Sequence, residues 1–194
     1  SRRKCSIRLC SSETDTCAAP TSCLRGAVHF HAPLLPSDSN MQIATWNVNS
    51  IKVRLEQVLG WLRTTQTDAL VMQETKTVDE LFPKDAFEAA GYLVAYCGQK
   101  TYNGVALAVR SDAFESIDDV TFNISGYPDP QKRLIAATLT EKAGRRLRLA
   151  GAYFPNGQEV GADKYLYKLD WMAALTLWIK EELALHENFV IGGD

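Results

Sequence analysis

The chain has 194 residues, with 21 lysines and arginines against 23 aspartates and glutamates, and its formal charge is −2. Hydrophobic residues make up 46% and charged residues 23%, which is ordinary for a globular protein and excludes a disordered acidic tail, a collagen-like chain or a strongly basic nucleic-acid-coating protein. No apolar run approaches the roughly 20 residues that span a bilayer, so a membrane-spanning protein is excluded as well.

Residues 1–40 differ in composition from the rest of the chain. This leader holds four of the five cysteines, and its five basic and three acidic residues leave it positively charged, whereas residues 41–194 are acidic. The cysteine spacings match no usual zinc-ligand pair, and no hydrophobic period is present. We expect residues 1–40 to be a disordered leader outside the domain that residues 41–194 form. The remaining Cys97 fits a reducing, cytoplasmic compartment.

From Met41 onward, predicted strands and helices alternate. The patterns predict a helix that begins after a Ser50 cap, a short helix at 84–90 and a long helix at 163–185. They predict strands at 42–47, 68–73, 93–96, 105–110, 133–140, 145–153 and 188–191, of which 68–73 and 188–191 are buried. The apolar side of the long helix is expected to carry Leu166, Leu169, Met172, Ala173, Thr176, Ile179 and Leu183. Strands that mix helical connections with a hairpin indicate an α/β layered sandwich rather than an all-parallel sheet.

Polar side chains follow several of the predicted strands. Asn47 and Asn49 follow the first strand, and Glu74 follows the second. Further along the chain, Tyr153 follows the hairpin and Asp194 follows the last strand. In layered α/β folds strand ends converge, so these residues can share one crevice. Carboxylate and amide oxygens are hard ligands, which suit Mg²⁺ or Mn²⁺ better than zinc.

Each of these residues also fits a structural role. Asn47 and Asn49 are common turn formers, Glu74 can be a solvated carboxylate, and Tyr153 can be a core aromatic with its hydroxyl at the surface. Asp194 fits an ordinary terminal residue or a helix cap. The arginines at 145–148 are expected to form a solvated strand face.

The stretch from Met41 resembles the exodeoxyribonuclease III family of apurinic/apyrimidinic (AP) endonucleases, within the endonuclease/exonuclease/phosphatase superfamily. Six fragments carry the resemblance in the family's order: Ile43-Ala-Thr-Trp-Asn-Val-Asn-Ser50, Asp68-Ala-Leu-Val-Met-Gln-Glu-Thr-Lys76, Gly98-Gln-Lys-Thr-Tyr-Asn-Gly-Val-Ala-Leu107, Gln131-Lys-Arg-Leu-Ile135, Gly151-Ala-Tyr-Phe-Pro-Asn-Gly157 and Ile191-Gly-Gly-Asp194. The resemblance implies an α/β sandwich of two mixed β-sheets flanked by helices, in four layers when complete. It implies that this chain supplies the N-terminal half of that domain or somewhat more, and we expect the chain alone to be weakly active or inactive.

The resemblance also implies a role for each matched residue. Glu74 is implied as the principal Mg²⁺ ligand, with Asn47 as a ligand or an orienter of the metal's surroundings. Tyr153 is similar to a tyrosine that contacts the scissile phosphate, and Asp194 to an aspartate that orients or deprotonates the attacking water and approaches the metal. The implied substrate-binding residues are Asn49, Lys76, Arg133 and Asn156.

The implied function is DNA repair. The resemblance implies an Mg²⁺-dependent phosphodiesterase (Mn²⁺ as an alternative) that acts on double-stranded DNA at abasic sites or 3′ ends, with AP endonuclease, 3′→5′ exonuclease and 3′-phosphatase activities. It also implies a monomer when complete, with no membrane partner. Two other readings stay open from the residues: a phosphoesterase of the same superfamily that acts on inositol phosphate or phospholipid, and a non-catalytic remnant or partner-binding module.

Overall fold

The computed structural model describes residues 6–9 and 41–194, which form two β-sheets and three α-helices. Sheet A contains β1 (Ser6–Leu9), β2 (Gln42–Asn47), β3 (Ala69–Gln73), β4 (Tyr92–Cys97) and β5 (Val105–Arg110). Sheet B contains β6 (Phe114–Phe122), β7 (Leu134–Glu141), β8 (Arg146–Ala152) and β9 (Phe189–Gly193). The helices are α1 (Ile51–Thr65), α2 (Lys84–Ala89) and α3 (Asp163–Leu185), with a short 3₁₀ helix, η1, at Asp79–Leu81. In this described part of the chain, no helix has the length and apolar character that crossing a membrane requires.

Both sheets mix parallel and antiparallel neighbours. The strand order in sheet A is β1-β2-β3-β5-β4, in which β1, β2 and β3 run parallel while β5 is antiparallel to both β3 and β4. The order in sheet B is β6-β7-β8-β9, and only β8 and β9 run parallel to each other. The expectation of two mixed sheets is therefore confirmed.

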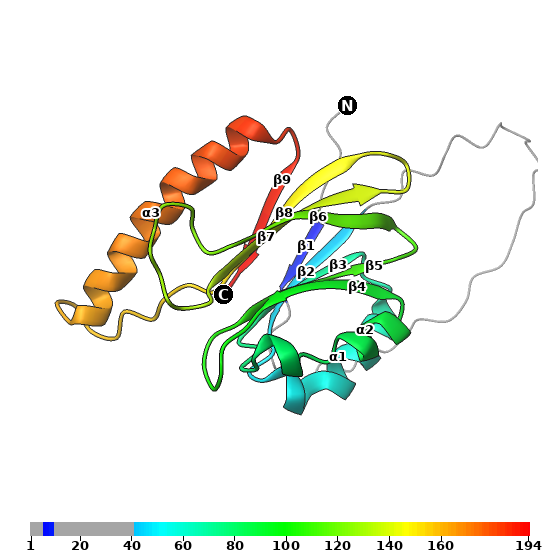
Figure 1. Cartoon of the computed structure of the whole chain (residues 1–194), viewed down its shortest axis with the longest axis horizontal. Helices are drawn as coiled ribbons and strands as arrows, with labels where there is room; N and C mark the ends of the chain where they lie inside the picture. The colour runs from blue at the N-terminus through cyan, green and yellow to red at the C-terminus, as the bar shows by residue number, and fades with distance from the viewer. Residues whose placement is uncertain (1–5, 10–40) are drawn as a thin grey trace, which may run out of the picture.

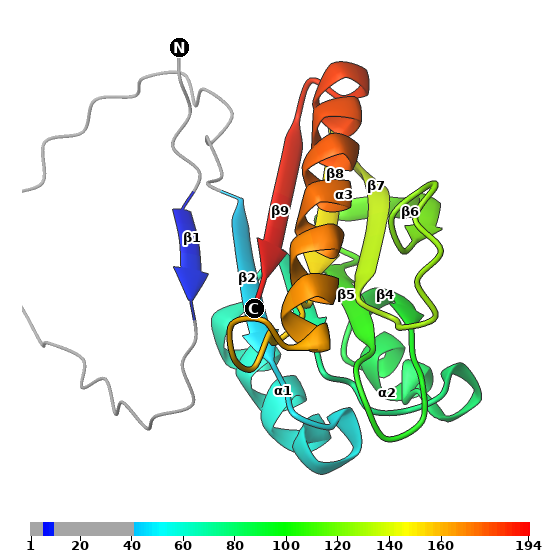
Figure 2. The same ribbon diagram turned by 90° about the vertical axis from the view of Figure 1, so that its left-hand side faces the viewer.

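The two sheets pack face to face, and helices cover their outer faces. Figures 1 and 2 show α1 and α2 beside sheet A and α3 beside sheet B. Both faces of β3 are buried, which is why its sequence is one continuous apolar run. Ala69 and Val71 pack between the sheets, while Leu70 and Met72 pack under α1 and α2. The result is the predicted layered sandwich, with the order helix, sheet, sheet, helix.

A glycine allows the two sheets to approach each other closely. Gly151 lies on β8 opposite β3, and a Cβ atom added there would lie 2.6 Å from Cγ1 of Val71. Contacts that short do not occur between real side chains, so a side chain at residue 151 would push the sheets apart.

The buried face of α3 differs from the predicted one. The residues that pack on sheet B are Trp171, Leu175 and Trp178, whereas Leu166 is 53% and Leu183 is 58% exposed. The helix carries apolar residues around most of its circumference, so helical spacing alone selected the wrong side, apart from Ile179, which packs against the same cluster. The large aromatic side chains are the ones that α3 buries, because they remove the most apolar surface from water.

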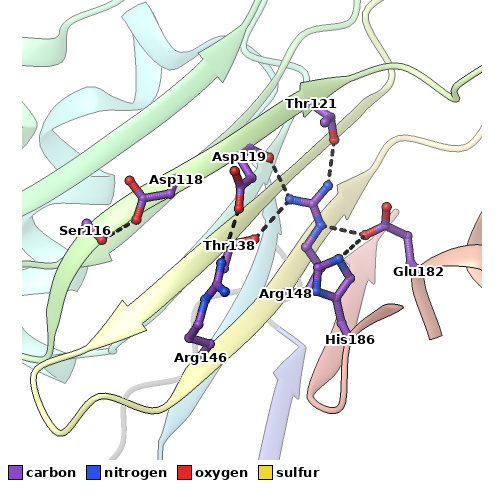
Figure 3. Close-up of polar contacts among 9 residues, drawn as sticks. All are labelled: Ser116, Asp118, Asp119, Thr121, Thr138, Arg146, Arg148, Glu182 and His186. Atoms are coloured by element: carbon purple, nitrogen blue, oxygen red, sulfur yellow. Dashed lines mark hydrogen bonds and ion pairs between the residues drawn. The ribbon is translucent and has the colours of Figure 1, made fainter. Parts of the chain in front are cut away.

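A polar network also attaches α3 to sheet B (Figure 3). Arg148 of β8 is only 4% exposed, and its Nε donates a hydrogen bond of 2.6 Å to Oε2 of Glu182 on α3. Its terminal nitrogens donate to the carbonyl oxygen of Asp119 and to the hydroxyl of Thr121, both on β6. The prediction of a solvated arginine face was therefore wrong for Arg148, because α3 covers that face of β8.

Three further differences from the predictions concern β6, Ser50 and β9. Strand β6 was not predicted, because it is an edge strand with many polar residues and with irregular register against β7. Ser50 makes no side-chain cap; instead its backbone N–H donates to the carbonyl oxygen of Glu74 at 2.7 Å. Strand β9 is only partly buried, because it forms the edge of sheet B within the described residues.

Most of the expected disordered leader lies outside the described residues. Four of its residues, Ser6–Leu9, form β1, which pairs with β2 in parallel register from Ser6 opposite Gln42 to Leu9 opposite Thr45.

Candidate active site

Four strand ends meet at one place and bring together residues that are far apart in the sequence. Asn47 is the last residue of β2, and Glu74 directly follows β3. Tyr153 directly follows β8, and Asp194 directly follows β9, beside the end of β2 (Figure 2). The parallel pairs β2–β3 and β8–β9 each place two carboxyl ends next to each other, and the packing of the two sheets joins the pairs.

Asn47 and Tyr153 hold the two carboxylates in position. The side-chain amide Nδ2 of Asn47 donates to Oε1 of Glu74 at 2.7 Å and to Oδ2 of Asp194 at 2.8 Å. The hydroxyl of Tyr153 donates to the same Oε1 of Glu74 at 2.9 Å. Oδ1 of Asn47 accepts the backbone N–H of Asn49, which fixes the amide in this orientation. In this arrangement Asn47 orients the carboxylates through its N–H groups.

The backbone around Glu74 has an unusual conformation that the neighbouring loops maintain. Glu74 has φ +53° and Lys76 has φ +51°, both in the left-handed region that costs energy for residues other than glycine. The carbonyl oxygen of Glu74 accepts the N–H of Ser50, and that of Thr75 accepts the N–H of Ile51, at the start of α1. The loop is therefore fastened to the start of a helix, which directs the Glu74 side chain toward Asp194.

Lys76 joins the site on the other side of Glu74. Its ammonium group lies 2.8 Å from Oε2 of Glu74 and donates a hydrogen bond to Oδ1 of Asn49. Asn49 and Lys76, two of the predicted substrate-binding residues, are thus brought together beside Glu74.

Arg133 and Asn156 lie outside the carboxylate cluster. The guanidinium of Arg133 stacks over the ring of Tyr153, with Cζ 4.9 Å from the ring centre, and its Nη1 donates to the carbonyl oxygen of Tyr153. Asn156 is exposed, and its Oδ1 accepts the backbone N–H of Gln158 in a local turn. The structure places Arg133 against the site and leaves Asn156 in the turn role.

Sequence reasoning missed two residues that contact Arg133. Gln131 accepts two hydrogen bonds from its guanidinium, and Tyr167 of α3 lies under it, with the ring centre 5.9 Å from Cζ. Gln131 belongs to the same matched fragment as Arg133, and that is the signal that could have identified it. Nothing in the pattern of α3 distinguishes Tyr167.

The protonation states of Glu74 and Tyr153 follow from these contacts. Burial tends to raise the pKa of Glu74, but hydrogen bonds from Asn47, Lys76 and Tyr153 outweigh it and hold the pKa below its usual value. Burial and the hydrogen bond to the Glu74 carboxylate raise the pKa of Tyr153 to about 12. At neutral pH the site therefore contains an ionised glutamate and a tyrosine hydroxyl that keeps its proton.

The donor set of the site suits a hard divalent cation. Within the described residues no three His, Cys, Asp or Glu side chains come together, which argues against a zinc-type cage. Mg²⁺ needs less from the protein, since it commonly takes one or two carboxylates and fills its other positions with water and phosphate. Glu74 and Asp194, joined through one amide group, supply that minimum.

Polar residues gathered at the strand ends of a layered α/β sandwich define the candidate site, and comparison with known proteins identifies the family to which this fold belongs. The chain belongs to the endonuclease/exonuclease/phosphatase family, whose model matches residues 44–194. The match begins inside β2 and includes all four residues of the site.

Among individual relatives, the chain is similar to exodeoxyribonuclease III of Haemophilus influenzae, with 30% identity over 159 residues that cover 79% of this chain and 57% of the relative. Among solved structures, it is similar to a 3′-phosphatase from Neisseria bound to a product DNA hairpin, with a TM-score of 0.73, 40% identity and coverage of 79% and 57%. It is also similar to an AP endonuclease from Archaeoglobus fulgidus, with a TM-score of 0.70, 37% identity and coverage of 78% and 56%. The chain thus spans a little over half the length of these relatives.

Proposed function

We propose that the protein is a metal-dependent DNA repair phosphodiesterase of the exodeoxyribonuclease III type. Its substrate is double-stranded DNA, which it cleaves at abasic sites and trims from 3′ ends as an exonuclease and 3′-phosphatase. The observation that carries the proposal is the Asn47 amide that joins the Glu74 and Asp194 carboxylates beside the Tyr153 hydroxyl. The relatives named above, which include an exodeoxyribonuclease, an AP endonuclease and a 3′-phosphatase, support the same conclusion.

In this proposal Glu74 and Asp194 hold the metal ion, which is Mg²⁺ or Mn²⁺. Phosphodiester hydrolysis adds negative charge to the nonbridging and leaving oxygens, and a bound divalent cation supplies the Lewis acidity that stabilises this charge. Asn47 keeps the two carboxylates at a fixed separation, so little rearrangement is needed when the cation binds.

The other residues bind the substrate and handle protons. Tyr153 keeps its proton at neutral pH, because its pKa is about 12, so its hydroxyl can donate a hydrogen bond to an anionic phosphate oxygen. Asp194 is exposed at the end of β9, where its carboxylate can orient the attacking water and accept a proton from it.

DNA contact is proposed to involve a few basic and polar groups rather than overall charge, because the chain carries a net charge of −2. Arg133 and Lys76 are the cations beside the site, and Asn49 and Asn156 are the polar groups around it. Contacts to the phosphate backbone are sufficient for a repair enzyme that needs no sequence readout. We further propose that the complete protein acts as a monomer in the cytoplasm.

Glu74→Gln tests the proposal in the whole protein, including any sequence that the gene encodes beyond these residues. We expect the wild type to cleave an abasic-site duplex only when Mg²⁺ or Mn²⁺ is present. Loss of the metal carboxylate is expected to reduce turnover about a thousandfold, since the metal contributes several kcal/mol. Glu88→Gln is the matched control, because Glu88 lies on α2 in an exposed pair with Lys84.

Two results would contradict the proposal. Hydrolysis of inositol phosphate or phospholipid in preference to abasic DNA would assign the site to another phosphoesterase. Unchanged activity of Glu74→Gln, with the fold intact by circular dichroism, would remove the metal role of Glu74.

A further inference from the structure

Within the described residues, the hydrogen bonds of Arg133 all go to neutral groups, although this arginine stacks on Tyr153 at the edge of the site. Its Nε and Nη2 donate to Oε1 of Gln131 at 3.0 and 2.7 Å, and its Nη1 donates to the carbonyl oxygen of Tyr153 at 3.2 Å. Of the ion pairs formed within residues 41–194, none involves Arg133, whereas the neighbouring Lys76 is paired with Glu74. In the described part of the chain, Arg133 therefore has no direct ion-pair partner.

The contacts of Arg133 leave part of its guanidinium available. An arginine has five N–H donors in a rigid planar fork, and the three named contacts use three of them. The hydroxyl of Tyr167 is a further hydrogen-bond partner of the guanidinium, so at least one N–H of the terminal nitrogens is left for a phosphate oxygen. A donor on a charged, planar guanidinium is well suited to phosphate binding.

Gln131 is fixed by a second pair of amide side chains behind it. Oε1 of Gln131 also accepts a hydrogen bond of 3.1 Å from Nδ2 of Asn103. The same Nδ2 donates to Oε1 of Gln99 at 3.2 Å, and that oxygen also accepts the backbone N–H of Lys132 at 2.8 Å. Asn103 is only 8% exposed, so this amide cluster belongs to the protein interior.

The amide cluster is also connected to the loop that carries Glu74. The backbone carbonyl oxygen of Asn103 accepts the N–H of Lys76 at 3.0 Å, and that of Gly104 accepts the N–H of Thr75 at 3.2 Å. Asn103 thus contacts Gln131, which holds Arg133, through its side chain, and it contacts the Glu74 loop through its backbone. One buried residue therefore couples the position of the Arg133 guanidinium to that of the Glu74 carboxylate.

We propose that Gln131 is a positioning residue, which holds Arg133 as an un-neutralised cation directed at a backbone phosphate of the bound DNA. The inference rests on the proposed function, since it assumes a polyanionic substrate. A glutamine suits this role because its amide oxygen accepts the same hydrogen bonds as a carboxylate while leaving the arginine charge free. A glutamate of the same shape would pair with Arg133 and compete with the phosphate.

Gln131→Glu tests the proposal in the whole protein with a DNA duplex that contains one abasic site. The carboxylate can accept every hydrogen bond that Oε1 accepts now, so the fold is expected to stay intact. We expect DNA affinity to fall about 10- to 100-fold, as for the loss of one charged contact. The plot of log affinity against log salt is expected to flatten by about one unit, and KM to rise with little change in kcat.

Gln57→Glu is the matched control. Gln57 is an exposed residue of α1 whose Oε1 also accepts a hydrogen bond from an arginine, Arg54, so the control adds the same charge beside the same kind of group away from the site. It is expected to leave the affinity, the salt slope and KM close to those of the wild type. Gln131→Ala adds no charge, and it is expected to raise KM while it leaves the salt slope unchanged.

Several outcomes would overturn the proposal. A salt slope for Gln131→Glu equal to that of Gln57→Glu would show that Arg133 binds no phosphate. A fall in kcat without a rise in KM would mean that Gln131 acts on the reacting groups instead. A wild-type protein that neither binds nor cleaves DNA would refute the proposed function itself, and this inference with it.

Discussion

The amide group of Asn47 lies between two carboxylates that are 120 residues apart in the chain: its Nδ2 is 2.7 Å from Oε1 of Glu74 and 2.8 Å from Oδ2 of Asp194. Without this donor, two negative groups would face each other across the strand ends. Asn47 therefore sets how closely the two carboxylates approach, and in the proposed function it thereby determines whether one cation can bind both.

Asn47→Ala is expected to weaken metal binding and activity by about 10- to 100-fold, as is typical when a residue that orients metal ligands is removed. Isothermal titration with Mn²⁺ and cleavage of an abasic duplex would measure both effects. Asn188→Ala is the control. Asn188 lies just before β9, and its side-chain amide also donates a hydrogen bond, but to the carbonyl oxygen of Arg146. Equal losses in the two variants would contradict the orienting role of Asn47.

Tyr153→Phe removes one hydroxyl and is expected to lower kcat about 10²- to 10³-fold, as for the loss of one donor to a developing oxyanion. Tyr92→Phe is the control, because the buried hydroxyl of Tyr92 donates to the carbonyl oxygen of Thr67, just after the C-terminal end of α1. That control is expected to cost about 1 kcal/mol of stability and to leave kcat unchanged. The reverse pattern would contradict the phosphate role of Tyr153.

The raised pKa of Tyr153 also predicts how stability changes at alkaline pH. The folded protein holds the Tyr153 proton up to about pH 12, whereas the unfolded chain releases it near the ordinary tyrosine pKa of 10.0. The contribution is therefore fully present below pH 10 and is lost as the pH rises toward 12. Metal-free wild type is expected to lose more stability than Tyr153→Phe over this range, as measured by urea unfolding. Parallel loss in both proteins would contradict the assignment.

The positions of the strand ends made the location of the site predictable from the sequence. The contacts that each side chain makes there were not predictable. Asn47, Glu74, Tyr153 and Asp194 could be grouped because each lies at the end of a recognisable strand, and strand ends converge in layered folds. Asn156 follows β8 as well, yet its side chain is used by a local turn, which spacing does not reveal. The link from Gln131 to Arg133 depends on side-chain directions within a loop that has no regular period.

The same distinction applies to the fold. Strand β3 was predictable because it is apolar on both faces, and the structure buries all five of its residues. The buried side of α3 was not, because Leu166 and Leu169 compete with Trp171 and Leu175 on a helix that is apolar nearly all round. Only the opposing surface of sheet B selects between them, and that surface is assembled from strands distant in the sequence.

Gly151→Ala is expected to destabilise the fold by about 1–3 kcal/mol, the usual cost of overpacking a core. The added Cβ would lie 2.6 Å from Cγ1 of Val71 and would separate the two sheets. Gly60→Ala is the matched control on α1, where nothing lies within 4 Å of the new Cβ, and it is expected to stabilise by about 0.5–1 kcal/mol. Chemical denaturation measures the free energy of unfolding of both variants. A change of the same sign in both would contradict the close packing at Gly151.

Glu182→Ala is expected to cost about 3–5 kcal/mol of stability, because it leaves the guanidinium of Arg148 buried without its counter-ion. Arg146→Ala removes one partner of a neighbouring pair with Asp119, whose side chains are 64% and 67% exposed, and it is expected to cost no more than about 1 kcal/mol. The two pairs appear together in Figure 3 and differ mainly in burial. Glu182→Gln separates charge from hydrogen bonding, since it keeps an acceptor for Nε of Arg148 and is expected to fall between the other two variants. Urea unfolding at low and high salt would measure the stability of all three variants. A loss of stability in Glu182→Ala that is salt-sensitive and no larger than the loss in Arg146→Ala would contradict a buried ion pair that holds α3 on sheet B.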